Sequence, residues 1–144
     1  MAKFITIGYG DNAGYQRTNR TARDAAHAFD AQRVRKGDVM GIAGKPMQVR
    51  NHDGLKTEVT AGAYLSAALP VAGFAMIEAP DLESAIEIAS HSPCAVNQGV
   101  VEVWPLEISP SREIHSVYSA RPQSRGAWTT TSEWLARLLR RARQ

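Results

Sequence analysis

The stretch VAGFAMIEAPDLESAIEIASHSPCAVNQGVVEVWPL, residues 71–106, predicts a strand, a helix and a second strand in immediate succession. Side chains of different size alternate along residues 71–79 and again along residues 100–104, as they do in strands with two unlike faces. Between these strands, Asp81 is a suitable N-cap, apolar residues follow at helical spacing, and Pro93 ends the run. A short strand–helix–strand crossover of this kind favours an α+β sandwich.

The two faces of these strands differ in bulk. One face carries small or β-branched side chains, which is typical of a sheet beneath helices. The opposite face carries three bulky apolar side chains with two carboxylates among them: Phe74, Met76, Trp104, Glu78 and Glu102. A sheet face in contact with water does not normally carry so much apolar surface. We therefore expect a second subunit or a ligand to cover this face.

The chain before residue 71 supplies the other elements of a split βαβ pattern. We expect elements at residues 4–9 (strand), 21–36 (helix), 39–43 (strand), and 47–51 with 55–60 (a hairpin through Asp53-Gly54). Residues 11–19 are polar and contain glycine, so we expect a loop there. The resulting order, β-α-β-hairpin-β-α-β, predicts an α+β fold with a ferredoxin-like antiparallel sheet.

Composition limits the number of domains and the class of protein. A chain of 144 residues with 44% hydrophobic and 22% charged residues is typical of one soluble globular domain with its own core. A single cysteine excludes an internal disulfide, and no apolar run approaches the ~18 residues of a membrane span. Residues 1–10 enter a strand without the layout of a signal peptide. We therefore expect a cytoplasmic protein without a membrane partner.

Residues 109–144 differ in character from the expected domain at residues 1–108. Residues 109–125 are rich in Ser, Pro and Arg and predict an extended linker, and Thr130 with Glu133 forms a capping box that opens a basic amphipathic C-terminal helix. We expect this helix to dock on its own subunit or on a neighbouring one. Nucleic-acid or anionic-surface binding is the other interpretation, and no second basic patch or known motif supports it.

The segment from about residue 3 to residue 106 resembles the YCII-related, or DGPF-domain, family. The resemblance is carried by the closing strand motif G-x-[VI]-E-V-x-P-[LV] at residues 99–106, the APDL helix start at residues 79–82 and the Pro-terminated helix. The chain departs from the family at residues 61–64, which read AGAY in place of Asp-Gly-Pro-Phe. The resemblance implies a dimeric α+β barrel, paired sheet to sheet, with a pocket between sheet and helix in each subunit. Relatives of this barrel include isomerase-like and dehalogenase-like enzymes that use no metal or organic cofactor.

Four side chains are candidates for acid–base catalysis. His27 and Asp30 share one flank of the first long helix, and a carboxylate beside an imidazole orients it and raises its pKa. Glu78 and Glu102 lie on the bulky sheet face, where apolar surroundings raise the pKa of a carboxyl group. The structural alternatives are a solvated helix flank for the first pair and ion pairs across a dimer for the glutamates. A related subgroup carries a His on the first helix and an Asp on the second; here the His is one position off and no Asp follows.

The ligand-binding candidates belong to the bulky face: Tyr9, Phe74, Met76 and Trp104. Scattered histidines and one cysteine give no metal signature, and residues 8–14 do not match the dinucleotide fingerprint, so we expect no metal and no cofactor. Our first hypothesis is a homodimeric, cofactor-independent isomerase, lyase or cyclase that acts on a small apolar molecule. The alternatives are a non-catalytic ligand-binding or accessory subunit, and a scaffold whose basic helix binds a partner.

Overall fold

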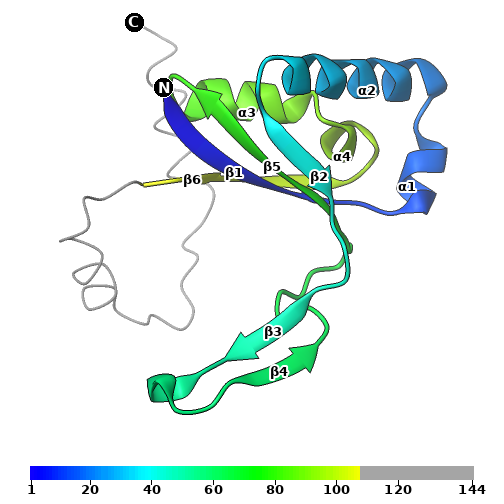
Figure 1. The fold of residues 1–144 in the computed structure, drawn as a ribbon. Coiled ribbons are helices and arrows are strands. Elements are labelled where there is room, and N and C mark those ends of the chain that lie inside the picture. Colours follow the sequence, from blue (N-terminus) through cyan, green and yellow to red (C-terminus); the bar gives the residue numbers. More distant parts are fainter. Residues whose placement is uncertain (108–144) are drawn as a thin grey trace, which may run out of the picture. The chain divides into compact units, whose positions relative to one another are not determined.

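Strand β1 (Ala2–Tyr9) lies in the interior of a four-stranded antiparallel sheet (Figure 1). It pairs along its whole length with β5 (Val71–Ala79) and, on its other side, with β6 (Val100–Pro105). Strand β2 (Val39–Ile42) pairs with β5 and completes the order β2-β5-β1-β6. This is the ferredoxin-like antiparallel sheet that the order of elements predicts, so the α+β fold class is confirmed.

The structure is a computed structural model and describes residues 1–107. The linker and basic helix predicted for residues 109–144 therefore lie outside the described residues. Within the described part, none of the helices is long and apolar enough to cross a lipid bilayer.

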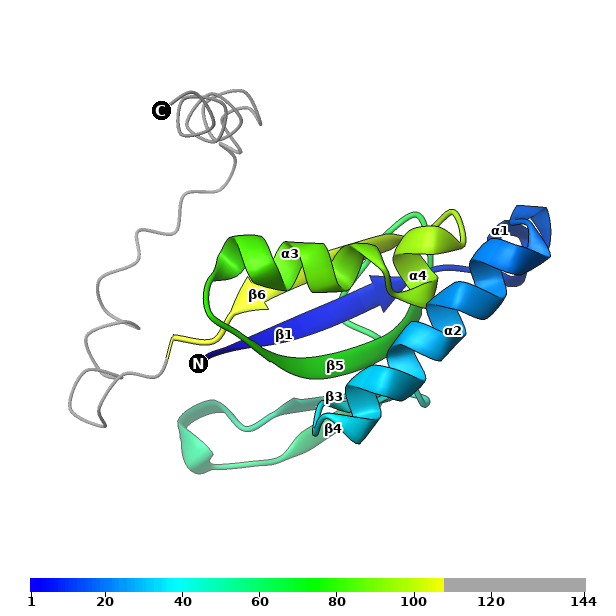
Figure 2. The same ribbon diagram turned by 90° about the horizontal axis from the view of Figure 1, so that it is seen from above.

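Helices α2 (Arg20–Arg35) and α3 (Leu82–Ser90) lie on the same face of the sheet, and the short helix α4 (Pro93–Val96) follows α3 on that face (Figure 2). The side chains of Asn19 and Asp81 cap the two long helices, since each accepts a hydrogen bond of 2.8 Å from a backbone N–H of the first turn. The bond from Ser84 also holds the pKa of Asp81 below its usual value. These caps fix where each helix leaves the sheet.

The hydrophobic core lies between this sheet face and α3. Its buried members are Phe4, Ile77, Ala79 and Ala85. Phe4 and Ile77 are register partners on β1 and β5, and Ala85 of α3 packs against them. Small side chains on the helix let it approach the strands closely, as the small face of the sequence pattern predicts.

The expectation of a loop at residues 11–19 is wrong, because α1 (Asn12–Arg17) forms there. Asp11 accepts a hydrogen bond from the backbone N–H of Gly14 at 2.8 Å, and the hydroxyl of Thr18 donates to the carbonyl oxygen of Gly14 at 3.0 Å. Polar side chains that we expected in a loop thus close both ends of a short helix. The helix places Tyr15 near the start of α2.

The predicted hairpin is present, with a longer connection than expected. Strands β3 (Met47–Arg50) and β4 (Glu58–Ala61) form a separate two-stranded sheet, and the 3₁₀ helix η1 (His52–Gly54) lies in the loop between them. Asp53 and Gly54 have positive φ angles of 55° and 69°, which is the backbone conformation that such turn residues favour. The hairpin extends away from the four-stranded sheet (Figure 1).

The sheet face opposite the helices is uncovered within the described residues. Phe74, Met76 and Trp104 are 49%, 38% and 52% exposed on this face. Their register explains the patch, because Ile5 of β1 pairs with Met76 on one side and with Trp104 on the other. The alternation of small and bulky positions in the sequence is therefore real, and it separates a helix-covered face from an open apolar one.

The close approach of Gly8 in β1 to Cys94 in α4 can be tested by measuring stability. A Cβ atom at Gly8 of β1 would lie 2.6 Å from Sγ of Cys94, whereas one at Gly10 would meet nothing within 4 Å. We expect Gly8→Ala to lower the free energy of unfolding by about 1–3 kcal/mol, because the packed interior must shift. Gly10→Ala is the matched control. Urea denaturation measures both; an unchanged midpoint for Gly8→Ala would refute the contact, and Cys94→Ala in the same background should restore part of the loss.

Candidate functional site

A cavity of about 370 Å³ lies between the helix-covered face of the sheet and the three helices α2, α3 and α4. This volume is in the range of small-molecule sites. Small residues of both layers border this space: Gly8, Gly73 and Ala75 of the sheet and Ala89 of α3. Most of the remaining wall is apolar, with Phe29, Met40, Ile77 and Ile88 among its members.

The charged side chains of the cavity come mainly from one flank of α2. His27, Asp30 and Arg33 are spaced three residues apart, and all three border the cavity. His27 is exposed and lies at the rim, Asp30 is half-buried, and the Arg33 side chain is only 15% exposed. The flank predicted from sequence for His27 and Asp30 therefore faces a cavity rather than open solvent alone.

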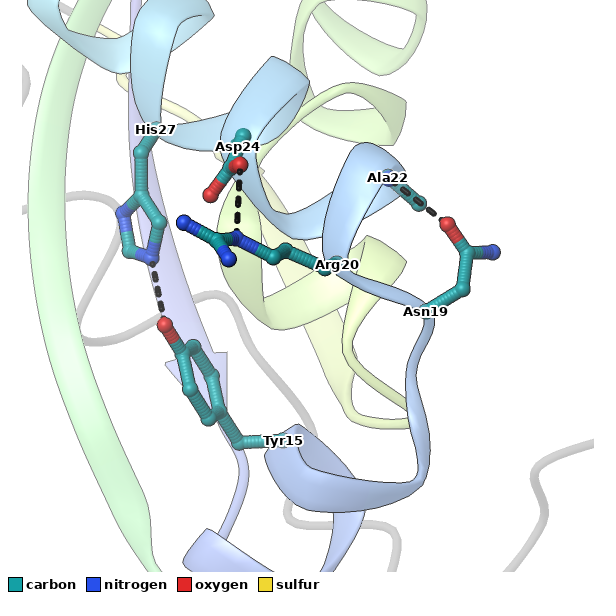
Figure 3. Close-up of polar contacts among 6 residues, drawn as sticks. All are labelled: Tyr15, Asn19, Arg20, Ala22, Asp24 and His27. Atoms are coloured by element: carbon teal, nitrogen blue, oxygen red, sulfur yellow. Dashed lines mark hydrogen bonds and ion pairs between the residues drawn. The ribbon is translucent and has the colours of Figure 1, made fainter.

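His27 is held from the α1 side. Its Nε2 atom lies 3.4 Å from the Tyr15 hydroxyl, and the two ring centroids are 5.9 Å apart (Figure 3). Arg23 covers the Tyr15 ring, with its guanidinium carbon 4.6 Å from the ring centroid. On the neighbouring flank, Arg20 and Asp24 form an exposed ion pair at 3.6 Å. Sequence reasoning missed Tyr15, because the residues around it were expected to form a loop; the Asp11 cap signal could have revealed the helix.

Asp30 has the electrostatic character of a candidate acid–base group. Its partial burial raises the pKa of its carboxyl group, and the charge of His27 lowers that pKa in part. No hydrogen bond within residues 1–107 involves this carboxyl group. Across the cavity, burial raises the pKa of the Cys94 thiol, and the Asp30 carboxylate raises it further. Asp30 is therefore close enough to Cys94 for their charges to interact.

Arg33 forms the most buried ion pair of the described residues. Its Nε donates to Oδ2 of Asp38 at 2.5 Å, and the Asp38 side chain is only 6% exposed. Gly37 makes the pair possible: its φ of 104° ends α2 and turns the chain back, so that the backbone N–H of Asp38 also donates to the carbonyl oxygen of Arg33 at 3.2 Å. Sequence reasoning missed this pair, because it depends on the turn of the chain at Gly37.

The other predicted site residues belong to the open sheet face, and of the predicted ligand-binding set Phe74 alone borders the cavity. Glu102 accepts a hydrogen bond of 2.7 Å from Nε1 of Trp104, and Glu78 pairs with Lys3 at 3.7 Å.

Tyr9 is buried; its burial raises the pKa of its hydroxyl, and the neighbouring Glu102 carboxylate raises it further. The structure thus brings His27 and Asp30 together at the cavity, and Tyr9 and Trp104 together around Glu102. Met76 and Glu78 lie on the same open face.

The described residues offer no ready metal site. Within residues 1–107, no three His, Cys, Asp or Glu side chains lie close enough together to hold a metal ion. The charged and titratable groups at the cavity include an imidazole, two carboxyl groups, a guanidinium group and a thiol.

Cys94 is the single cysteine of the chain, and the pKa of its thiol depends on the charge of Asp30. We expect Asp30→Asn to lower the pKa of this thiol, because the variant removes the negative charge that opposes thiolate formation. The pH profile of the iodoacetamide alkylation rate should then move to lower pH. Asp24→Asn, an exposed carboxylate of the same helix, is the control and should leave the profile in place. Superimposable profiles for wild type and Asp30→Asn would show that the two groups do not interact.

Comparison with known proteins agrees with the geometry of the fold. The family model for the YCII-related domain matches residues 2–108. No curated protein sequence matches the chain. The matched segment contains the whole four-stranded sheet, its helices and the cavity. Since the match covers most of the chain, it confirms the resemblance found in the sequence: the protein belongs to the YCII-related domain family.

Proposed function

We propose that the protein is a small cofactor-independent enzyme of the isomerase, lyase or cyclase type, and that it binds a small organic molecule in the cavity beneath α2. The observation that carries the proposal is the Asp30 carboxyl group. It lies half-buried in a mainly apolar cavity, beside His27, with a raised pKa. A carboxyl group in such surroundings exchanges protons closer to neutral pH than an exposed one does.

In this proposal Asp30 and His27 share one proton-transfer task. One group removes a proton from a carbon atom of the bound molecule, and the other returns a proton at a second atom or at a leaving group. Tyr15 orients the imidazole through Nε2, which leaves Nδ1 without a hydrogen-bond partner among the described residues. Since the proton taken from one atom is returned at another, the reaction is balanced without an oxidant or reductant.

The open sheet face has a different place in the proposal: it is the surface on which two copies of the chain pair. The exposed Phe74, Met76 and Trp104 form an apolar patch that association would bury, and Val39 at the edge of the sheet is 70% exposed. Glu78 and Glu102 each have a partner within their own subunit. In the dimer they would belong to the interface and would take no part in proton transfer.

Dimer formation through this face gives a direct prediction. We expect Met76→Glu to weaken the dimer by at least about 100-fold, because the interface would bury an unpaired carboxylate. Analytical ultracentrifugation of the full chain at micromolar concentration measures the effect. The control is Ile86→Glu, which changes an apolar side chain of α3, 39% exposed, on the helix side of the sheet. A wild-type chain that sediments as a monomer at these concentrations would rule out the proposed pairing.

The catalytic proposal can be tested before the substrate is known. An enzyme of this type exchanges hydrogens of bound carbon acids with solvent, so NMR in D₂O should detect deuterium entering suitable small ketones, lactones or acids. We expect Asp30→Asn to slow this exchange by about 10²–10⁴-fold, which is the usual contribution of a general acid or base. Loss of His27 in His27→Ala should have a similar effect.

Glu102→Gln serves as the control for this experiment and should exchange at the wild-type rate. A rate that falls with Glu102→Gln and persists in Asp30→Asn would move the chemistry to the open sheet face. Compounds that bind in the cavity and show no exchange would favour the second candidate, a non-catalytic ligand-binding or accessory subunit. The mainly apolar wall of the cavity is the observation that favours this second candidate.

A further inference from the structure

The guanidinium group of Arg33 has more hydrogen-bonding capacity than its ion pair uses. Asp38 accepts from Nε only, at 2.5 Å. A guanidinium group carries five N–H donors, and the four on its terminal nitrogens make no hydrogen bond within the described residues. These donors belong to a side chain that is 15% exposed and borders the cavity. Their nitrogens keep some contact with solvent, so a ligand bound there would replace water as their hydrogen-bond partner.

Asp38 holds this guanidinium in a fixed orientation. The carboxylate is 6% exposed and binds the inner edge of the guanidinium, while a backbone hydrogen bond ties Asp38 to the end of α2. The outer edge, with two parallel N–H groups, has the geometry that a second carboxylate binds in a bidentate manner. A lysine in this place would have three N–H donors on one nitrogen and would lack the planar edge that binds a carboxylate in a bidentate manner.

We propose that the terminal nitrogens of Arg33 form a carboxylate-binding subsite, so that the natural ligand of the cavity is a small organic acid with an apolar body. The body lies against Phe29, Ile77 and Ile88, which border the same space. This inference rests on the proposed function in one respect, because it assigns the ligand to the same cavity.

The positions of Arg33 and Asp30 also indicate which carbon atom of this acid reacts. The two residues are three positions apart on α2, so their Cβ atoms are separated by roughly 5–6 Å. A ligand held by its carboxylate on Arg33 therefore presents to Asp30 a carbon only a few bonds from that carboxylate. The bound negative charge would further favour the protonated form of Asp30, which suits it to donate a proton.

Protection of Cys94 from alkylation measures binding directly, since this thiol borders the cavity. The probes are two matched pairs, hexanoate with hexanamide and benzoate with benzamide, and the reagent is iodoacetamide, which is neutral and does not itself bind to Arg33. We expect each acid to protect the wild-type chain at a concentration about ten- to a hundredfold below that of its amide, as for a charge-assisted bidentate contact.

Three variants separate recognition from structure. Arg33→Lys keeps a cation beside Asp38, and the double variant Arg33→Met/Asp38→Asn removes both charges so that none is buried alone. Both should lose the preference for acids while amides protect as before, and thermal melting checks that each is folded. Arg35→Met, an exposed arginine of the same helix, should keep the full preference.

Equal protection by acid and amide in the wild type would overturn the subsite, as would an acid preference that survives in the double variant, or probes that fail to protect at millimolar concentration. The proposed function fails in a different assay. Asp30→Asn should slow deuterium exchange by about 10²–10⁴-fold and keep the acid preference, so loss of one property does not imply loss of the other.

Discussion

Among residues 1–107, helices cover the sheet on one side only, and the rest of the described structure depends on this constraint. Both long helices connect strands of the same antiparallel sheet, and both lie on the same face of it (Figure 2). The core formed by Phe4, Ile77 and Ala85 therefore lies between that face and a single layer of helices. Burial of apolar surface stabilises this side, and the other side keeps Phe74, Met76 and Trp104 exposed among the described residues.

The same one-sided packing produces the cavity. Small residues, among them Ala75 of the sheet and Ala89 of α3, border the space beneath the helices. Since α2 borders that space along one flank, every third residue from His27 to Arg33 contributes a polar group to an otherwise mainly apolar wall. Burial raises the pKa of Asp30 and leaves the Arg33 side chain only 15% exposed.

Short-range features account for the polar details of this wall. The positive φ of Gly37 ends α2 and brings Asp38 back to Arg33, and Asp11 opens the short helix that carries Tyr15 to His27. Neither the turn at Gly37 nor the cap at Asp11 lies in the core, yet each determines how a cavity side chain is oriented. The cavity is thus a product of layer packing, and the orientation of its polar side chains depends on the turn that follows α2 and on the short helix that precedes it.

Much of this architecture could be predicted from the sequence, because its causes are local. Alternation of side-chain size marks the strands, Asp81 and Gly37 mark helix ends, and helical spacing places His27 and Asp30 on one flank. The order of elements then leads to the ferredoxin-like sheet. Local pattern reasoning was wrong at residues 11–19, because hydrogen bonds from Asp11 and Thr18 turned a polar segment into a helix.

Only the tertiary structure decided on which side of the sheet the candidate site lies. The sequence shows that one face is bulky, and for that reason the ligand was expected over Phe74 and Trp104, although the family resemblance implied a pocket between sheet and helix. It does not show that small residues on the opposite face leave a cavity, because a void depends on how closely two layers approach. Nor does it show the pairing of Arg33 with Asp38 or the influence of Asp30 on Cys94. These interactions depend on distances between side chains that only the packed layers set.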